Sequence, residues 1–164
     1  MATSDFQEKK ITYWSRDEAN NLIQRYCALQ ERCHSEVRSK LLEHGVYGDV
    51  LEELISDLIS NNFLDEERFA RTFARGKFRM KHWGKNKIKS ELKLRKVSAY
   101  SINEAMKEID HDEYIGTLKM LLDKKERTTT FKNRYDRLKK LTDYATVKGY
   151  EYEWISELLK GDLL

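Results

Sequence analysis

The chain has 164 residues, of which 36% are charged and 40% hydrophobic, and its formal net charge is +3 at pH 7. This length is enough for one domain or for a few small stacked units. No apolar run approaches the roughly 18 residues that a membrane helix needs, and the N-terminus has no apolar signal core, so we expect a cytoplasmic protein. Proline is absent and glycine occurs only seven times. Because proline interrupts helices, this composition favours an all-helical chain.

The charge is divided unevenly along the sequence. Residues 68–96 hold twelve Lys or Arg residues and one acid, Glu91, which gives this segment a net charge of +11 and leaves −8 for the rest of the chain. A basic block in an otherwise acidic chain indicates a polyanionic partner or a partner with an acidic groove.

The first third of the chain predicts an N-terminal arm over residues 1–14 and three helices. Ser15 and Glu18 have the spacing of a capping box at the start of the first helix. The second helix is expected to stop at Gly45, since glycine suits the left-handed turn that follows a helix. A third amphipathic helix begins near Asp49.

The middle third opens with a helix from Asp65 to about His82. Four arginines lie within about 80° of arc on this helix and form a ridge, and they are Arg68, Arg71, Arg75 and Arg79. Its apolar side is expected to carry Phe69, Phe73 and Met80.

A hinge at Trp83-Gly84 is expected to separate this helix from a second basic helix, which runs from Lys85 to about Arg95. That helix presents a lysine strip of Lys89, Lys93 and Lys96. Ser101 and Glu104 then have capping-box spacing at the start of a short helix.

The last third predicts three more helices, one of which ends near Gly149. The resulting nine helices fall into threes, because apolar positions recur at offsets of 51 and then 53 residues. The matched sets are Val37, Ile88 and Leu141; Leu41, Leu92 and Ala145; Val46, Val97 and Tyr150; and Leu51, Ile102 and Ile155.

We therefore expect an all-α fold of three tandem three-helix repeats over residues 15–61, 63–110 and 112–161. Each repeat is one longer helix followed by a helix-turn-helix. Such a stack is expected to be elongated and curved, and to bind along a groove rather than enclose a small molecule. Lys96 stands where the other two repeats have glycine, so the helix end there is expected to be less sharply turned.

No catalytic constellation is present in the sequence. It lacks a Gly-rich phosphate loop, an HExxH pair and a nucleophile elbow. Cys27 and Cys33 are expected to be reduced thiols. A metal site formed by these cysteines and His34 is not expected, because no second pair of ligands at metal-binding spacing follows in the sequence. We therefore expect a binding protein, not an enzyme, with no cofactor and no metal.

One hypothesis is a helix-turn-helix protein that binds duplex DNA directly through the basic block. Arginine suits phosphates because its guanidinium is a planar fork of donors. Two roles are open for Trp83: it could stack on a base, or it could close the seam between two repeats. Likewise, the arginine ridge is either a contact surface or a solvated face that is paired with acids of the neighbouring repeat.

The other hypothesis is a protein that binds a protein–nucleic-acid assembly. In this case the basic middle would face phosphates or acidic side chains, and the acidic ends would contact protein. The separation of charge favours this reading.

The order and spacing of several short patterns resemble the bacterial RecX regulatory proteins. The patterns are FLDEERFA from Phe63, Arg75, GKNKIKSEL from Gly84, SEVRSKLLEHGV from Ser35, Tyr26-Cys27 and Lys148-Gly149-Tyr150. Together they cover about residues 10–160. Each pattern is short, and their order carries the resemblance.

The resemblance implies a regulator of RecA, the recombinase that polymerises on single-stranded DNA, acting in DNA repair and the SOS response. A capped stack of helices is itself expected to be a monomer. Family members lie in the filament groove, limit filament extension or promote disassembly, and suppress strand exchange, ATP hydrolysis and coprotease activity. The partners implied are the RecA filament, single-stranded DNA and, weakly, double-stranded DNA. The residues expected to make these contacts are Arg68, Arg71, Arg75, Lys77, Arg79, Lys81, Trp83, Lys85, Lys87, Lys89 and Lys93.

Overall fold

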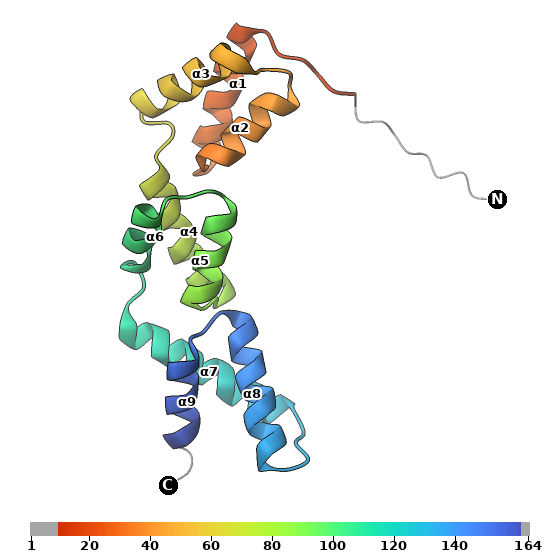
Figure 1. Cartoon of the computed structure of the whole chain (residues 1–164), viewed down its shortest axis with the longest axis vertical. Helices are drawn as coiled ribbons and strands as arrows, with labels where there is room; N and C mark the ends of the chain where they lie inside the picture. The colour runs from red at the N-terminus through yellow and green to blue at the C-terminus, as the bar shows by residue number, and fades with distance from the viewer. Residues whose placement is uncertain (1–9, 162–164) are drawn as a thin grey trace, which may run out of the picture. The chain divides into compact units, whose positions relative to one another are not determined.

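A computed structural model describes residues 10–161, and over this range the chain forms nine α-helices and no β-strand (Figure 1). The predicted all-α fold is therefore confirmed. In chain order the helices are α1 (Arg16–Leu29), α2 (His34–Glu43), α3 (Gly48–Ser60), α4 (Glu66–Lys81), α5 (Lys85–Leu94), α6 (Ala99–Met106), α7 (His111–Thr128), α8 (Arg134–Lys148) and α9 (Tyr152–Gly161). None of these described helices is long and apolar enough to cross a membrane.

The helices belong to two compact units, one ending at Asp65 and one beginning at Glu66. Unit 1 holds α1, α2 and α3 around a shared apolar core that includes Ile23, Val37 and Leu54. Unit 2 holds α4 to α9, with α4 packed chiefly along α6, and α7 packed on α8 and α9. The division into three repeats at residues 62 and 111 stays a prediction.

The start of α1 is fixed by the predicted capping box. The Ser15 hydroxyl accepts the Glu18 N–H, and the Glu18 carboxylate accepts the Ser15 N–H. Just before it, the Trp14 ring stacks on the His44 ring with centroids 3.7 Å apart, and the Trp14 N–H donates to the His44 carbonyl. Residue 14 of the predicted arm thus docks on the end of α2, while residues 1–9 lie outside the described part.

All twelve residues of the predicted repeat positions are buried, each at most 6% exposed. In addition, α2, α5 and α8 end in the same turn. One residue of each turn, namely Gly45, Lys96 or Gly149, has positive φ. Its N–H and that of the next residue donate back to carbonyls three and five residues earlier. These paired bonds define the Schellman motif.

The prediction that Lys96 loosens this turn was wrong. Lys96 has φ of 58° and makes the same bonds as the two glycines. The buried neighbours, Leu92 before the turn and Val97 after it, require the chain to reverse there. The lysine therefore takes a left-handed conformation that L-residues with a Cβ disfavour.

Two other sequence predictions need correction. Met80 was placed on the apolar side of α4 but is 77% exposed, whereas Phe78 is buried, because the core face follows Ala70 and Ala74 at four-residue spacing. Helix α6 begins at Ala99, not at Ser101, and Ser98 is its N-cap, with its hydroxyl accepting the Ser101 N–H.

Candidate nucleic-acid interface

The basic block forms all of α4 after its first turn, the connecting turn and all of α5. Its charged face is not uniform. Of the eleven predicted contact residues, four are exposed, and these are Arg75, Arg79, Lys81 and Lys93. Seven are half-buried, and these are Arg68, Arg71, Lys77, Trp83, Lys85, Lys87 and Lys89.

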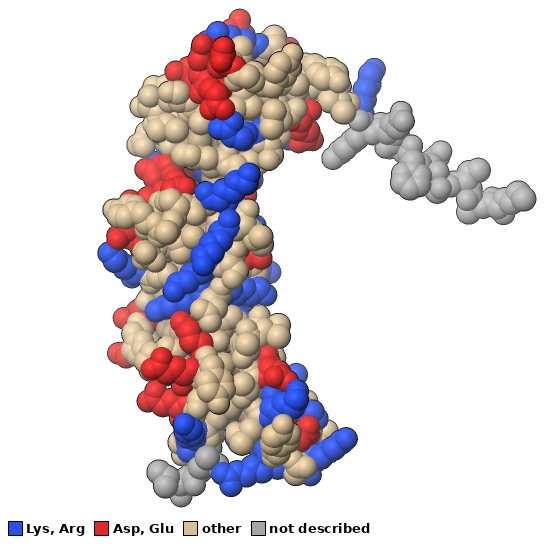
Figure 2. Space-filling view, in the orientation of Figure 1, with Lys and Arg blue, Asp and Glu red and all other residues tan. Residues whose placement is uncertain are grey.

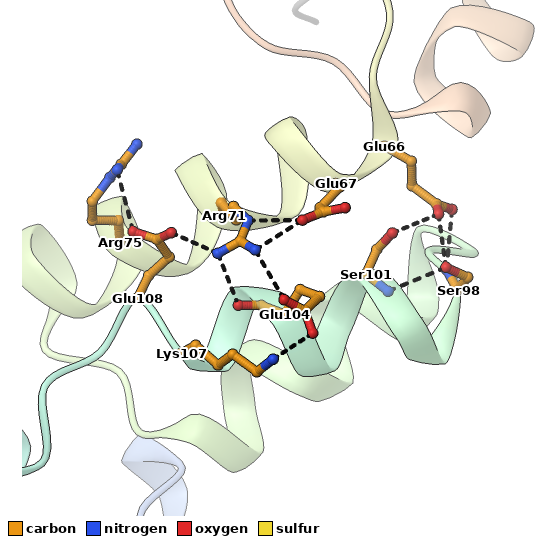
Figure 3. A network of polar contacts seen from close by, with 9 residues as sticks. All are labelled: Glu66, Glu67, Arg71, Arg75, Ser98, Ser101, Glu104, Lys107 and Glu108. Carbon is orange, nitrogen blue, oxygen red and sulfur yellow. Dashed lines mark hydrogen bonds and ion pairs between the residues drawn. The ribbon is translucent and has the colours of Figure 1, made fainter.

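Arg71 is the centre of an ion-pair network between α4 and α6 (Figure 3). Its guanidinium donates to Glu67 at 2.8 Å, to Glu104 at 3.0 Å and to Glu108 at 2.8 Å, and also to the Glu104 carbonyl. Hydrogen bonds to Glu67 and Glu108 raise the pKa of Arg71 above its ordinary value, so the charge is permanent. Arg75 joins the network through Glu108 at 3.3 Å.

The arginines of the predicted ridge therefore differ in their partners. Arg71, and in part Arg75, are held by carboxylates of α4 and α6, as in the alternative that pairs the ridge with acids. Those acids lie within the middle repeat and not in a neighbouring one. Arg71 consequently has few donors left for a ligand, and its bonds link α4 to α6.

A second polar link joins the start of α4 to the start of α6. The Glu66 carboxylate accepts the Ser98 N–H at 3.0 Å, the Ser98 hydroxyl at 2.8 Å and the Ser101 hydroxyl at 2.9 Å (Figure 3). Because a carboxylate near a helix N-terminus also meets the positive end of the helix dipole, Glu66 stabilises α6 in two ways.

Trp83 lies among cations of α4 and α5. The Lys77 and Lys87 ammonium groups are 4.9 Å and 4.5 Å from the centroid of its six- and five-membered ring system, and Phe73 meets it edge-on at 6.5 Å. Cation–π attraction of this kind holds the two ammonium groups at defined positions. The contacts of the Trp83 ring are therefore with residues of α4 and α5, and the surroundings of the ring are cationic. Stacking of Trp83 on a base stays a prediction.

The seam between the middle and last thirds of the chain is closed by backbone atoms next to Trp83. The Gly84 N–H donates to the Lys148 carbonyl at 2.8 Å, and the Asn86 N–H donates to the Gly149 carbonyl at 2.9 Å. The C-terminal carbonyls of α8 thus satisfy the first N–H groups of α5, which no residue of α5 itself can satisfy.

Two buried tyrosines complete this seam. The Tyr114 hydroxyl accepts the Lys85 N–H at 2.9 Å and donates to Glu151, and the Tyr150 hydroxyl donates to the His82 carbonyl at 3.0 Å. Burial raises the pKa of Tyr114 and of Tyr150 above their ordinary values. The predicted break at Trp83-Gly84 is confirmed, since α4 ends at Lys81 and α5 begins at Lys85. The sequence did not predict that Gly84 is buried and that its backbone is bonded across the seam.

Several cations of the block have no carboxylate partner among residues 10–161. Arg79 and Lys81 at the end of α4, and Lys89 and Lys93 on α5, make no ion pair in that range. Figure 2 shows Lys and Arg side chains in a band across this part of unit 2. We call these four residues, together with Lys77, Lys85 and Lys87, the α4/α5 basic surface.

The sequence prediction missed one cation and the partners of another. Arg95 lies 4.9 Å over the Phe73 ring and bonds Glu91 at 2.7 Å, which joins the end of α5 to α4. Nothing in the sequence around Phe73 indicated that Arg95 would lie over its ring, because the contact depends on how α5 packs on α4. The same holds for Glu104 and Glu108, which are more than thirty residues from Arg71.

No group of three or more metal-ligating side chains is found over residues 10–161. Cys27 and Cys33 are both buried, and neither is in a disulfide.

Comparison with known proteins identifies the family. The sequence model of the RecX second three-helix domain matches residues 65–106. The regulatory protein RecX of Lactococcus lactis subsp. cremoris (strain SK11) is 30% identical over 148 residues, which are 88% of this chain and 55% of that protein. The RecX of Prosthecochloris aestuarii is 28% identical over 134 residues, covering 82% of this chain and 86% of the relative.

This chain belongs to the RecX family. It spans a little over half the length of its Lactococcus and Clostridium tetani relatives. The crystal structure of RecX from Lactobacillus salivarius superposes with a TM-score of 0.80 at 20% identity, covering 91% of this chain and 97% of the other. A second crystal structure of regulatory protein RecX gives 0.81 at 20% identity, covering 89% and 73%. The RecX fold predicted from the sequence is thus confirmed.

Proposed function

We propose that this RecX-family chain binds the groove of the RecA–single-stranded DNA filament and regulates it without chemistry of its own. In this proposal the α4/α5 basic surface faces the DNA phosphates or acidic groove surfaces. The bound protein then limits filament extension, ATP hydrolysis, strand exchange and coprotease activity. Binding that favours one state of the filament over another can do this without a catalytic residue.

The observation that supports this proposal most directly is the state of the cations. Lys81, Lys89 and Lys93 have no carboxylate partner among the described residues, and α5 is anchored at its first turn by α8. Because the helix that carries these lysines is already in place, only their side chains have to be ordered when they bind a polyanion. The mainly electrostatic contact fits a partner read by its backbone and not by base sequence.

The rival hypothesis, direct reading of duplex DNA, is disfavoured by the second helix of the first two helix-turn-helix motifs, which are α3 and α6. In such motifs this helix enters the major groove and needs to tolerate phosphates on either side. Here α3 carries four acids and no Lys or Arg, and α6 carries no Lys or Arg. The acid of α6, Glu104, bonds Arg71 and Lys107.

The test is an ATPase assay on RecA–single-stranded DNA with increasing amounts of this protein. We expect inhibition at stoichiometric levels, and no inhibition at those levels would contradict the proposal. Lys89→Glu/Lys93→Glu should relieve inhibition. The matched control, Arg25→Glu/Lys160→Glu, makes the same change of charge at exposed positions on helices other than α4 and α5 and should inhibit like the parent.

Two further measurements separate the alternatives. Adding the protein to growing and to preformed filaments distinguishes blocked extension from promoted disassembly. Selection from random duplex DNA addresses the rival hypothesis, because recovery of a consensus site would favour it. Free single-stranded DNA binding should lose about 0.7 units of salt slope for each lysine reversed.

A further inference from the structure

A second basic region lies in unit 2, outside the block described above. Residues 124–148 hold nine Lys or Arg residues and three Asp or Glu residues, a net charge of +6. The expectation that both ends of the chain are acidic is therefore wrong for its last third. This positive region is hidden in the net charge of −8 for all residues outside 68–96, because residues 1–67 and 97–123 are negative.

The three acids of this region are all bound within it. Glu126 pairs with Arg137, Asp136 with Lys140 at 2.9 Å, and Asp143 with Lys139 at 2.7 Å. The remaining six cations make no ion pair over residues 10–161, and they are Lys124, Lys125, Arg127, Lys132, Arg134 and Lys148. Figure 2 shows Lys and Arg side chains around the end of unit 2 that α8 and the preceding loop form.

An open groove of about 500 Å³ lies within this region, between α7 and α8. Its walls are mainly apolar and come from Tyr144, Val147, Thr129 and the stems of Lys125 and Lys140. Asp143 completes the lining, and its charge is paired with Lys139. Val147 is 75% exposed although it is aliphatic. An exposed aliphatic side chain in a hollow that is rimmed by lysines is typical of a place where another chain binds.

We propose that this α7/α8 groove docks an acidic peptide segment that carries one apolar anchor side chain. The apolar walls take the anchor, and the unpaired cations attract the flanking carboxylates. A peptide is favoured over a nucleic acid because the aromatic face is already in use: the Lys125 ammonium lies 5.1 Å over the Tyr144 ring, where a base would have to stack.

The test uses the full chain and two fluorescein-labelled twelve-residue peptides made of Asp, Glu and Ser, one with a central Leu and one with Ser in its place. We expect the Leu peptide to bind at least about tenfold more tightly in fluorescence anisotropy, since one leucine is buried. Val147→Asp should weaken its binding by about tenfold or more, and Lys125→Glu by roughly threefold or more.

Leu94→Asp is the matched control for the apolar change, because Leu94 stands 53 residues before Val147 at the end of α5 and is 76% exposed. Lys160→Glu is the control for the charge change. Both should bind the Leu peptide within twofold of the parent. If Val147→Asp lost its helical circular dichroism, the proposal would still be tested by comparing how tightly Lys125→Glu and Lys160→Glu bind the Leu peptide.

Equal binding of the two peptides would overturn the proposal, as would equal effects of the groove and control variants. Twelve-residue oligothymidylate is the competitor for the other class of ligand. If it displaced the Leu peptide at equal concentration, with the same dependence on Val147, the groove would be a nucleic-acid site instead. The assay contains no recombinase, so its failure and a failure in the ATPase assay are independent results.

Discussion

Gly84 and Gly149 meet backbone to backbone, and neither position has room for a side chain. A Cβ on Gly84 would overlap the carbonyl carbon and oxygen of Gly149 and the nitrogen of Tyr150. A Cβ on Gly149 would overlap the Lys87 backbone and Cβ. These close approaches let the end of α8 cap the start of α5, so that two elements 65 residues apart share one hydrogen-bonded turn.

Gly84→Ala is therefore expected to destabilise unit 2. The added methyl group cannot be accommodated by a flexible side chain because the overlapping atoms are backbone, and we expect a loss of about 1–3 kcal/mol in the free energy of unfolding. Urea unfolding followed by circular dichroism measures it. Gly76→Ala is the matched control, since Gly76 lies within α4 with no atom near its Cβ position, and it should stabilise by roughly 0.5–1 kcal/mol. Equal effects of Gly84→Ala and Gly76→Ala on the free energy of unfolding would contradict the close backbone contact between Gly84 and Gly149.

Lys96→Gly is expected to stabilise the protein. Lys96 has φ of 58°, where a Cβ is strained and glycine is not, and the gain should be about 0.5–1 kcal/mol after the greater flexibility of the unfolded chain is subtracted. Thermal unfolding measures this gain. Lys96→Gln removes the same charge but keeps the Cβ, and it should leave stability within a few tenths of a kcal/mol. A gain in both variants would assign the effect to charge.

Arg71→Gln and Arg79→Gln should have opposite phenotypes although both remove one arginine of α4. Arg71 bonds three carboxylates of α4 and α6, and its loss leaves those acids facing one another. We expect a lower melting temperature with single-stranded DNA affinity little changed. Arg79→Gln should retain the parent melting temperature and weaken DNA binding. Differential scanning fluorimetry measures the melting temperatures of the two variants, and fluorescence anisotropy measures their affinity for single-stranded DNA. The opposite pair of outcomes would contradict a structural role for Arg71.

The same network predicts a dependence of stability on acid pH. A hydrogen bond from Lys107, with the charge of Arg71 adding to it, lowers the pKa of Glu104 below its ordinary value of 4.5. Below pH 4.5 the unfolded chain takes up a proton that the folded chain does not accept until a lower pH, so stability falls as the pH drops through this range.

Glu104→Gln removes this linkage. The variant should be less stable than the parent at pH 7, and the difference should shrink as the pH falls below 4.5. Urea midpoints measured at intervals across this range test it. Glu153→Gln, at an exposed acid of α9 that has no ion pair among residues 10–161, should follow the parent curve in parallel. A difference that grows at low pH would have the wrong sign for a carboxyl with a lowered pKa.

The parts of this fold that the sequence predicts are those encoded locally. Ser15 and Glu18 are three residues apart, and the repeated apolar positions follow helical spacing, so caps, helices and core could be found by inspection. Arg71 could not be assigned in this way, because two of its acids are 33 and 37 residues away and only packing of α4 on α6 brings them close. The close approach of Gly84 to Gly149 could not be predicted for the same reason: a glycine that ends a helix and one that admits another backbone look alike in sequence.

The shared turn also bears on the order in which the chain acquires its structure. The first N–H groups of α5 are complete only when Lys148 and Gly149 are present, more than sixty residues later in synthesis. We therefore expect the first turn of α5 to be frayed while the chain is being translated, and to form fully only after this long-range contact, which is a slow kind of step in folding. A nascent chain released before Tyr150 would carry the lysines of α5 on a helix that is not yet anchored.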